Sequence, residues 1–152
     1  MCIRDSCNSL LTGAADIHFK RLQSVQNAAA RLVSGTCCHD HITPVLTKLH
    51  WLPVHKRVMF KTVMLVWKCL DGTAPGYLSE LCIPVASASG RQHLRSASTG
   101  LLQVPRARTM IGLWSFAVAG PSLWNSLPAA LRRPEMTVHT FKRQLKAYLF
   151  HI

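Results

Sequence analysis

Carboxylate side chains could support phosphoryl transfer, because polymerases and nucleases bind Mg²⁺ through acids that converge on the metal. The 152-residue sequence has six of them, at Asp5, Asp16, Asp40, Asp71, Glu80 and Glu135. No two are adjacent, and the Asp-Asp pair typical of polymerases does not occur. The sequence also lacks the G-x-S-x-G turn of a serine nucleophile and the phosphate-binding G-x-x-x-x-G-K loop. We therefore expect a chain without catalytic residues, which is not an enzyme by itself.

The run CCHDH at residues 37–41 contains residue types that bind zinc. Structural zinc sites usually combine two ligand pairs, each with two to four residues between its members. Here the two cysteines are adjacent, and the later Cys69 and Cys82 do not have the spacing of a zinc knuckle. We expect a loop that happens to contain these side chains, with no metal and no other cofactor. A zinc-binding domain is an alternative.

Lysine and arginine side chains dominate the charge of the chain. There are 18 of them against 6 acidic residues, which gives a formal net charge of +12 and a pI near 10.1. Such a surface attracts nucleic-acid phosphates, with an affinity that falls as salt rises and carries no sequence specificity. A basic face that is merely solvated is the alternative. The candidate nucleic-acid-binding residues are Arg57, Lys61, Lys68, Arg91, Arg95, Arg106, Arg108, Lys142, Arg143 and Lys146.

Tryptophan side chains are the second residue type that could contact nucleic acid, because bases stack on their rings. Trp67 falls on the apolar side of a predicted helix, so we interpret it as a core residue. Trp51 is a further candidate for stacking. Trp114 and Trp124 lie in or beside predicted loops, and both interpretations stay open for them.

The composition fits one globular domain, or one domain with loose flanks. Hydrophobic residues make up 49% of the chain and charged residues only 16%, below the usual quarter, so we expect part of the surface to be covered by another protein part. The longest strongly apolar run, residues 63–67, is far shorter than the ~20 residues that cross a bilayer, which predicts no membrane partner. Six irregularly spaced cysteines without a recognisable secretory signal indicate reduced thiols and an intracellular protein.

Three helices are predicted in the first half of the chain. The first covers residues 16–34, with Asp16 as its cap and Gly35 as its stop. Thr43 and Pro44 have the types of a helix cap and a first helical residue, and they predict a short second helix. Pro53 starts the third helix, which ends near residue 70. The inward face of the first helix is predicted to consist of Leu22, Val25, Ala29 and Leu32.

The third helix carries two faces in this prediction. Its broad apolar face consists of Val58, Met59, Val63, Val66, Trp67 and Leu70. On another face Arg57, Lys61 and Lys68 lie within roughly 40° of one another, by the 100° per residue of a helix. Met64 falls among these three residues, so the basic stripe is interrupted by one apolar side chain.

The second half of the chain is predicted to be less regular. One or two helical turns fall within residues 74–81, and residues 83–112 form a basic loop or linker. The apolar runs 101–104 and 113–118 could pair as a β-hairpin. Gly120-Pro121 and Pro128 each start a helical turn, and Pro134 stops the second of these. Thr137 caps a final helix, to about residue 150, whose apolar face is Val138, Phe141, Leu145 and Leu149.

Together these elements predict a mainly α fold, a small helical array with a short β-hairpin near residues 101–118. A helical segment at 7–82 is followed by the linker at 83–112 and by a C-terminal helical segment at 113–152. The first six residues, MCIRDS, resemble a translated adapter remnant, so we set them aside as non-native.

Several blocks of the sequence resemble, in the expected order, the C-terminal region of the reverse transcriptases of LINE-type (non-LTR) retrotransposons of the jockey-like kind. The blocks are RLQSVQNAAARLVSGT (21–36), DHITPVLTKLHWLPVHKRVMFK (40–61), APGYLSEL (74–81), SFAVAGPSLWNSLPAALR (115–132) and TFKRQLKAYLF (140–150). The resemblance implies a thumb and tail region that follows the polymerase palm and grips the template–primer duplex.

The same resemblance implies that the catalytic palm and the endonuclease of the parent enzyme lie upstream of these blocks. We therefore expect a non-catalytic fragment of an RNA-directed DNA polymerase. Its expected partners are the backbone of RNA or of an RNA–DNA hybrid, and the missing upstream polymerase domain. Two alternatives are a free-standing basic nucleic-acid-binding module and a protein-interaction scaffold whose charge is incidental.

Overall fold

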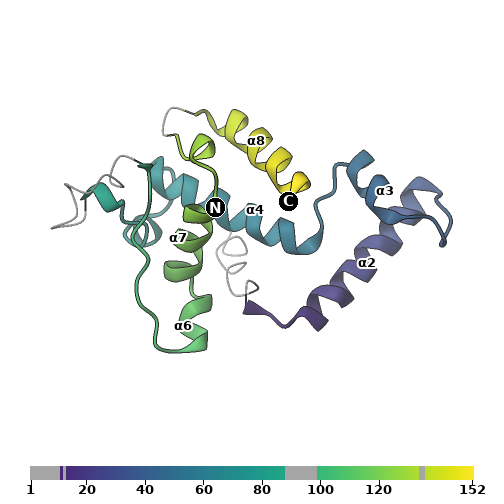
Figure 1. Cartoon of the computed structure of the whole chain (residues 1–152), viewed down its shortest axis with the longest axis horizontal. Coiled ribbons are helices and arrows are strands. Elements are labelled where there is room, and N and C mark those ends of the chain that lie inside the picture. The colour runs from purple at the N-terminus through teal and green to yellow at the C-terminus, as the bar shows by residue number, and fades with distance from the viewer. Residues whose placement is uncertain (1–10, 12, 88–98, 134–135) are drawn as a thin grey trace.

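The computed structural model describes residues 11, 13–87, 99–133 and 136–152, and these residues form a mainly helical array (Figure 1). The predicted mainly α fold is confirmed. Within the described part, β pairing is limited to an isolated antiparallel bridge between Pro84 and Leu102. In chain order the elements are α2 (Asp16–Ser34), α3 (Ile42–Lys48), α4 (Val54–Leu70), α5 (Gly76–Ser79), the 3-10 turn η2 (Val85–Ser87), α6 (Met110–Trp114), α7 (Phe116–Ser126), the 3-10 turn η4 (Ala129–Leu131) and α8 (Val138–His151).

Helix α4 lies at the centre of the array, with α7 and α8 packed on it and with α2 and α5 near its two ends (Figure 1). The sequence predicted Pro53 as its first residue, but Pro53 is the N-cap, one residue before the helix starts at Val54. Asp71 and Gly72 end the helix, as the sequence predicted, and Gly72 has a left-handed φ of 75°. The helix is buried on more sides than one apolar face requires, because Thr62, Met64, Leu65 and Cys69 are also inaccessible. A helix that is apolar on most sides is typical of a core position.

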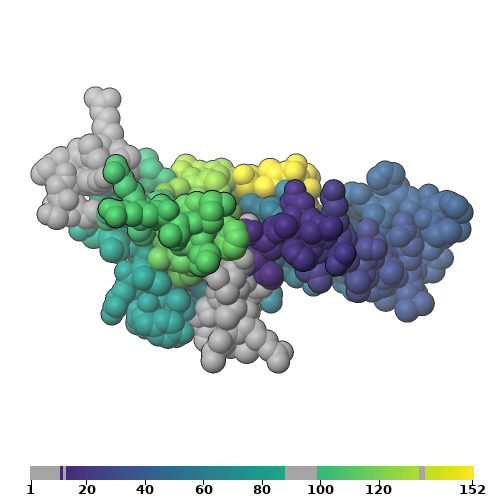
Figure 2. All heavy atoms as spheres, turned by 90° about the horizontal axis from the view of Figure 1, so that it is seen from below, coloured from purple at the N-terminus to yellow at the C-terminus, as the bar shows by residue number. Residues whose placement is uncertain are grey.

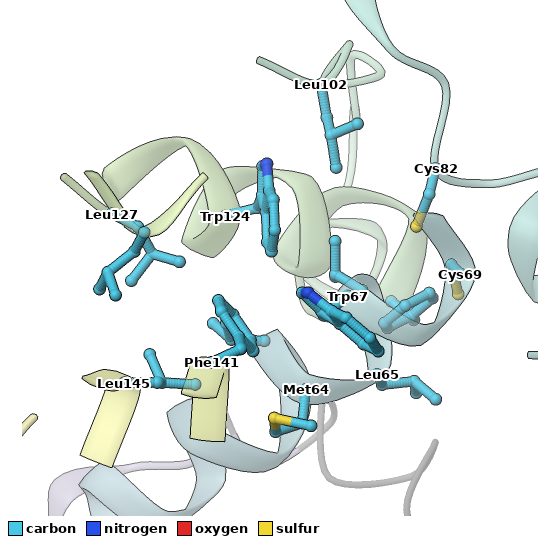
Figure 3. Close-up of a cluster of buried hydrophobic side chains, with 14 of the residues drawn as sticks. Met64, Leu65, Trp67, Cys69, Cys82, Leu102, Trp124, Leu127, Phe141 and Leu145 are labelled. Carbon is cyan, nitrogen blue, oxygen red and sulfur yellow. The ribbon is translucent and has the colours of Figure 1, made fainter. Parts of the chain in front are cut away.

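The core is centred on three aromatic rings from α4, α7 and α8 (Figure 3). The ring centroid of Phe141 lies 5.8 Å from that of Trp67 and 5.9 Å from that of Trp124. The predicted inward face of the last helix is confirmed, since Phe141, Leu145 and Leu149 are 0%, 0% and 2% exposed. The predicted cap is also confirmed, because the Thr137 hydroxyl accepts a hydrogen bond from the Thr140 amide.

The β-hairpin prediction is wrong. Residues 113–118 lie in α6 and α7, which are separated by Ser115, while Leu102 pairs with Pro84 instead. Gly120 and Pro121 do not start a helix but lie inside α7. A Cβ on Gly120 would lie 3.0 Å from Cγ2 of Val66, so the glycine allows α7 to approach α4 closely. The apolar residues 116–118 therefore pack against helix α4 as part of α7. A run this short has no periodicity that distinguishes a helix from a strand.

Helices α2 and α3 form one end of the molecule (Figure 1, Figure 2). The predicted span of α2 is confirmed, and Gly35 ends it with a left-handed φ of 66°. Asp16 is not the cap, because it is already helical and Ala15 occupies the cap position. Thr43 is not a cap either, since α3 starts one residue earlier, after His41. Pro44 is tolerated there because the N–H groups in the first turn of a helix have no acceptor within the helix, so the missing N–H of proline breaks no hydrogen bond.

The predicted inward face of α2 is turned away from the core. Val25 and Leu32 are 69% and 86% exposed, and Ala30, from another side of the helix, is the buried residue of α2. Two hydrogen bonds explain this rotation: Gln26 donates to the Leu52 carbonyl, and Gln23 accepts from the amide of Val54, at 2.9 Å each. The second bond satisfies a first-turn amide of α4, which has no partner within its own helix.

None of the described helices is both long and apolar enough to cross a lipid bilayer.

Candidate nucleic-acid interface

Three of the predicted basic residues meet around one open hollow of about 400 Å³. Arg57 and Lys61 come from α4, and Lys146 comes from α8, 85 residues further along the chain. His50, Leu52 and Phe60 complete the lining. The hollow therefore combines cationic side chains with an apolar floor.

The crossing of α8 over α4 creates this arrangement. Arg57 and Lys61 are exposed and lie one turn apart on α4. The next residue on that side, Met64, is only 6% exposed and belongs to the core that also contains Phe141 and Leu145 of α8 (Figure 3). Lys146 directly follows Leu145, so the packing of α8 on α4 carries its ammonium group to the hollow.

His50 is a lining residue that the sequence did not assign to this site. Its φ of 55° is left-handed, the one such case among the described non-glycine residues. Its amide donates to the Thr47 carbonyl at 2.9 Å, and the next amide, of Trp51, donates to the Leu46 carbonyl at 2.8 Å. This turn connects α3 to α4. No sequence pattern indicates a left-handed histidine, so only the backbone geometry could identify it.

The other predicted residues on α4 and α8 divide into two groups. Lys142 and Arg143 are exposed on α8, and Lys142 lies one turn before Lys146 on the same side of the helix. Lys68 is half-buried and lies beyond the buried Met64, so it is separated from Arg57 and Lys61. The predicted stripe of α4 is therefore interrupted more strongly than the sequence suggested.

The remaining predicted residues do not join the hollow. Arg106 and Arg108 are exposed in the segment that precedes α6, and neither lines the hollow. Arg91 and Arg95 lie outside the described residues. Among the predicted basic residues that the structure describes, Arg57, Lys61 and Lys146 therefore share one site, and Arg106 and Arg108 are exposed elsewhere.

The tryptophans are largely committed to packing. Trp67 is 6% exposed, which confirms its core assignment, and Trp124 is 3% exposed with its Nε1 donating to the Gly100 carbonyl at 2.9 Å. Trp114 is half-buried and its ring contacts Gly13. Trp51 is half-buried against α2. None of the four rings is fully exposed for stacking on a base.

The four cysteines that the structure describes lie in two separate places. Cys37 and Cys38 are exposed in the loop after α2, where a hydrogen bond from the backbone of His39 lowers the pKa of Cys37. Cys69 and Cys82 are buried in the core, where their thiols contact each other; Cys82 acts as donor, which raises its pKa and lowers the pKa of Cys69. Across the described residues, no three His, Cys, Asp or Glu side chains are grouped to hold a metal ion.

A second hollow, of about 420 Å³, lies between α2 and the start of α4. Its lining is mainly apolar, with Leu22, Val25, Ala29, Trp51 and Val54 beside Gln26 and Arg57. Arg57 borders both hollows. The exposed face of α2 therefore continues into an apolar groove that adjoins the basic site.

No protein-family model, curated protein or solved structure matches this chain.

Proposed function

We propose that this chain is the non-catalytic C-terminal part of a retrotransposon RNA-directed DNA polymerase, and that it binds the backbone of RNA or of an RNA–DNA hybrid. The polymerase origin rests on the resemblance of the sequence blocks, and the observation that carries the binding half is the convergence of Arg57, Lys61 and Lys146 on one hollow from two helices. Lys142 extends the same basic surface along α8.

Phosphate binding is the chemistry that this surface supports best. Lysine and arginine donate charge-assisted hydrogen bonds to phosphate oxygens, and arginine does so with two parallel bonds. The lining of this hollow contains cations, apolar side chains and His50, but no carboxylate that could bind a catalytic Mg²⁺. The site is therefore suited to hold a nucleic-acid backbone.

The apolar face of α2 supports the second half of the proposal, that the chain packs against another part of a larger polymerase. Ile17, Leu22, Val25, Leu32 and Val33 are all between 48% and 86% exposed. An exposed apolar patch of this kind usually marks an interface with another protein surface. A free-standing binding module would have little reason to keep such a face.

The binding half can be tested by fluorescence anisotropy with a labelled RNA–DNA hybrid of arbitrary sequence at several salt concentrations. We expect the affinity to fall steeply between about 50 and 200 mM salt and to be similar for unrelated sequences. An affinity that stays flat across this range would contradict phosphate binding and would favour a protein-interaction scaffold.

The packing half can be tested by sedimentation of the purified chain. We expect self-association, which the double substitution Val25→Ser and Leu32→Ser should reduce, because both side chains are exposed on α2. The matched control is Met110→Ser with Ile111→Ser, which changes two side chains of α6 that are 65% and 72% exposed. A monomeric unaltered chain, or equal effects of the two variants, would argue against a covering partner on α2.

A further inference from the structure

The basic hollow contains an aromatic ring that phosphate binding alone does not use. Phe60 of α4 lines the hollow together with Arg57, Lys61 and Lys146. Arg57, Phe60 and Lys61 lie within roughly 100° of one another around α4, by the 100° per residue of a helix. The side chain of Phe60 is half-buried, so it packs against the core and still contributes accessible surface to the hollow. One surface therefore presents a ring and three cations.

Hydrogen bonds hold the part of the lining that comes from the turn between α3 and α4. The amide of Trp51 donates to the Leu46 carbonyl at 2.8 Å, and the Gln26 side chain donates to the Leu52 carbonyl at 2.9 Å. These bonds connect residues 51–52 to α3 and to α2. Because this part of the lining is fixed within the fold, a ligand does not have to order it on binding.

His50 adds a second ring to the lining, in a backbone conformation that residues with a Cβ rarely adopt. Its φ is 55°, and its side chain is exposed. Left-handed angles are unfavourable for most residues other than glycine, and such residues are concentrated at sites that bind ligands. Here the conformation places an imidazole ring at the same hollow as the Phe60 ring.

A single strand of nucleic acid matches this combination of side chains better than a duplex does. Proteins that bind single strands combine cations for the phosphates with aromatic side chains on which the bases stack. In a duplex the faces of the bases are covered by their neighbours, so a duplex could contact the cations but could not use the rings. The volume of the hollow, about 400 Å³, also falls in the range of sites that enclose a small organic group.

We infer that the hollow binds single-stranded RNA or DNA, with one unpaired base stacked on Phe60 and the flanking phosphates on the three cations. This inference rests on the nucleic-acid binding proposed above and specifies the form of nucleic acid that the same site prefers. It assigns to Phe60 the stacking role for which the tryptophans are not fully exposed.

Fluorescence anisotropy of the full chain at one moderate salt concentration can test this inference with three labelled probes. They are a single-stranded oligothymidylate, an oligomer of the same length in which every nucleotide lacks its base, and the oligothymidylate paired with oligoriboadenylate. The two single strands carry the same phosphates, so the difference between them measures the contribution of the bases. We expect the intact strand to bind at least about fivefold more tightly than the abasic oligomer, because each stacked base contributes to the affinity. We also expect the hybrid to bind more weakly than the intact strand, although its higher charge density favours it electrostatically.

Phe60→Leu should remove the preference for the intact strand over the abasic oligomer, since leucine is apolar but has no ring. The affinity for the abasic oligomer should stay unchanged in this variant, because the three cations are retained. The matched control is Phe19→Leu, which replaces a half-buried phenylalanine of α2 outside the lining of the hollow and should keep the preference.

Equal affinities for the intact and abasic single strands, both falling as salt rises, would overturn this inference and leave the proposed phosphate binding in place. Tighter binding of the hybrid than of the intact strand would also overturn it. No binding of any of the three probes would overturn the proposed nucleic-acid binding and this inference together. An equal loss of preference in Phe19→Leu would refute the role of Phe60. The comparison of probes uses the unaltered chain, so it does not depend on the folding of a variant.

Discussion

Replacing Arg57, Lys61 and Lys146 together by glutamine should weaken binding to an RNA–DNA hybrid by about two to three orders of magnitude at 0.1 M salt. We estimate this loss of affinity from three phosphate contacts, because these three cations line one hollow. Each phosphate contact contributes roughly 0.7 to 0.9 to the slope of log affinity against log salt. Three contacts therefore change the slope by about 2 to 3, and the affinity by a similar number of decades at 0.1 M salt relative to 1 M.

The assay is fluorescence anisotropy at four or more salt concentrations, which gives both the affinity and the slope. The matched control replaces Lys20, Arg21 and Lys48 by glutamine, three exposed residues of α2 and α3. Both variants lose three positive charges, so a difference between them reflects the position of the charges and not the net charge. An equal loss of slope in the control would refute the assignment of the hollow, as would an unchanged slope in the first variant.

Three further predictions concern the framework and its thiols. Phe141→Ala should lower the free energy of unfolding by about 3–5 kcal/mol, because it empties the space between two indole rings, and urea denaturation would measure the loss; a shift below about 1 kcal/mol would contradict the central place of this ring. Thr137→Ala should cost about 1 kcal/mol, since the Thr140 amide loses its acceptor, and an unchanged urea midpoint would show that the cap is unimportant. Alkylation of Cys37 should accelerate as pH rises and level off at a lower pH than in a free peptide, because the thiolate is the reactive form and the backbone of His39 stabilises it. Mass spectrometry after timed labelling would measure the rate at each pH, and a midpoint equal to that of the free peptide would contradict the prediction.

Local sequence signals determined where α2 and α4 end and where α8 begins. Gly35 and Gly72 end α2 and α4 because both adopt left-handed backbone angles that cost glycine little. Thr137 starts α8 because its hydroxyl accepts a first-turn amide. These signals act over three or four residues, so they can be recognised without knowledge of the rest of the fold.

The predictions that failed concern contacts between distant residues. The predicted hairpin was wrong because the apolar run at residues 113–118 is too short to indicate a helix or a strand by itself. Its structure depends on whether α4 or a strand lies next to it. A local prediction also failed: the cap expected at Thr43 is His41, two residues earlier, because Ile42 and Thr43 are already helical. The rotation of α2 was missed because Gln23 and Gln26 bind the backbone of the turn before α4, a contact that spans about thirty residues.

The candidate site also depends partly on local sequence and partly on contacts between distant residues. By itself, the sequence determined a strongly basic, mainly helical chain and named Arg57, Lys61 and Lys146 among ten candidate cations. Only the tertiary structure selected these three, because α8 packs on α4 through Phe141 and Leu145 and so carries Lys146 to the other two. Charge and helix periodicity are properties of neighbouring residues, whereas the meeting of two helices depends on how their side chains fill a shared core.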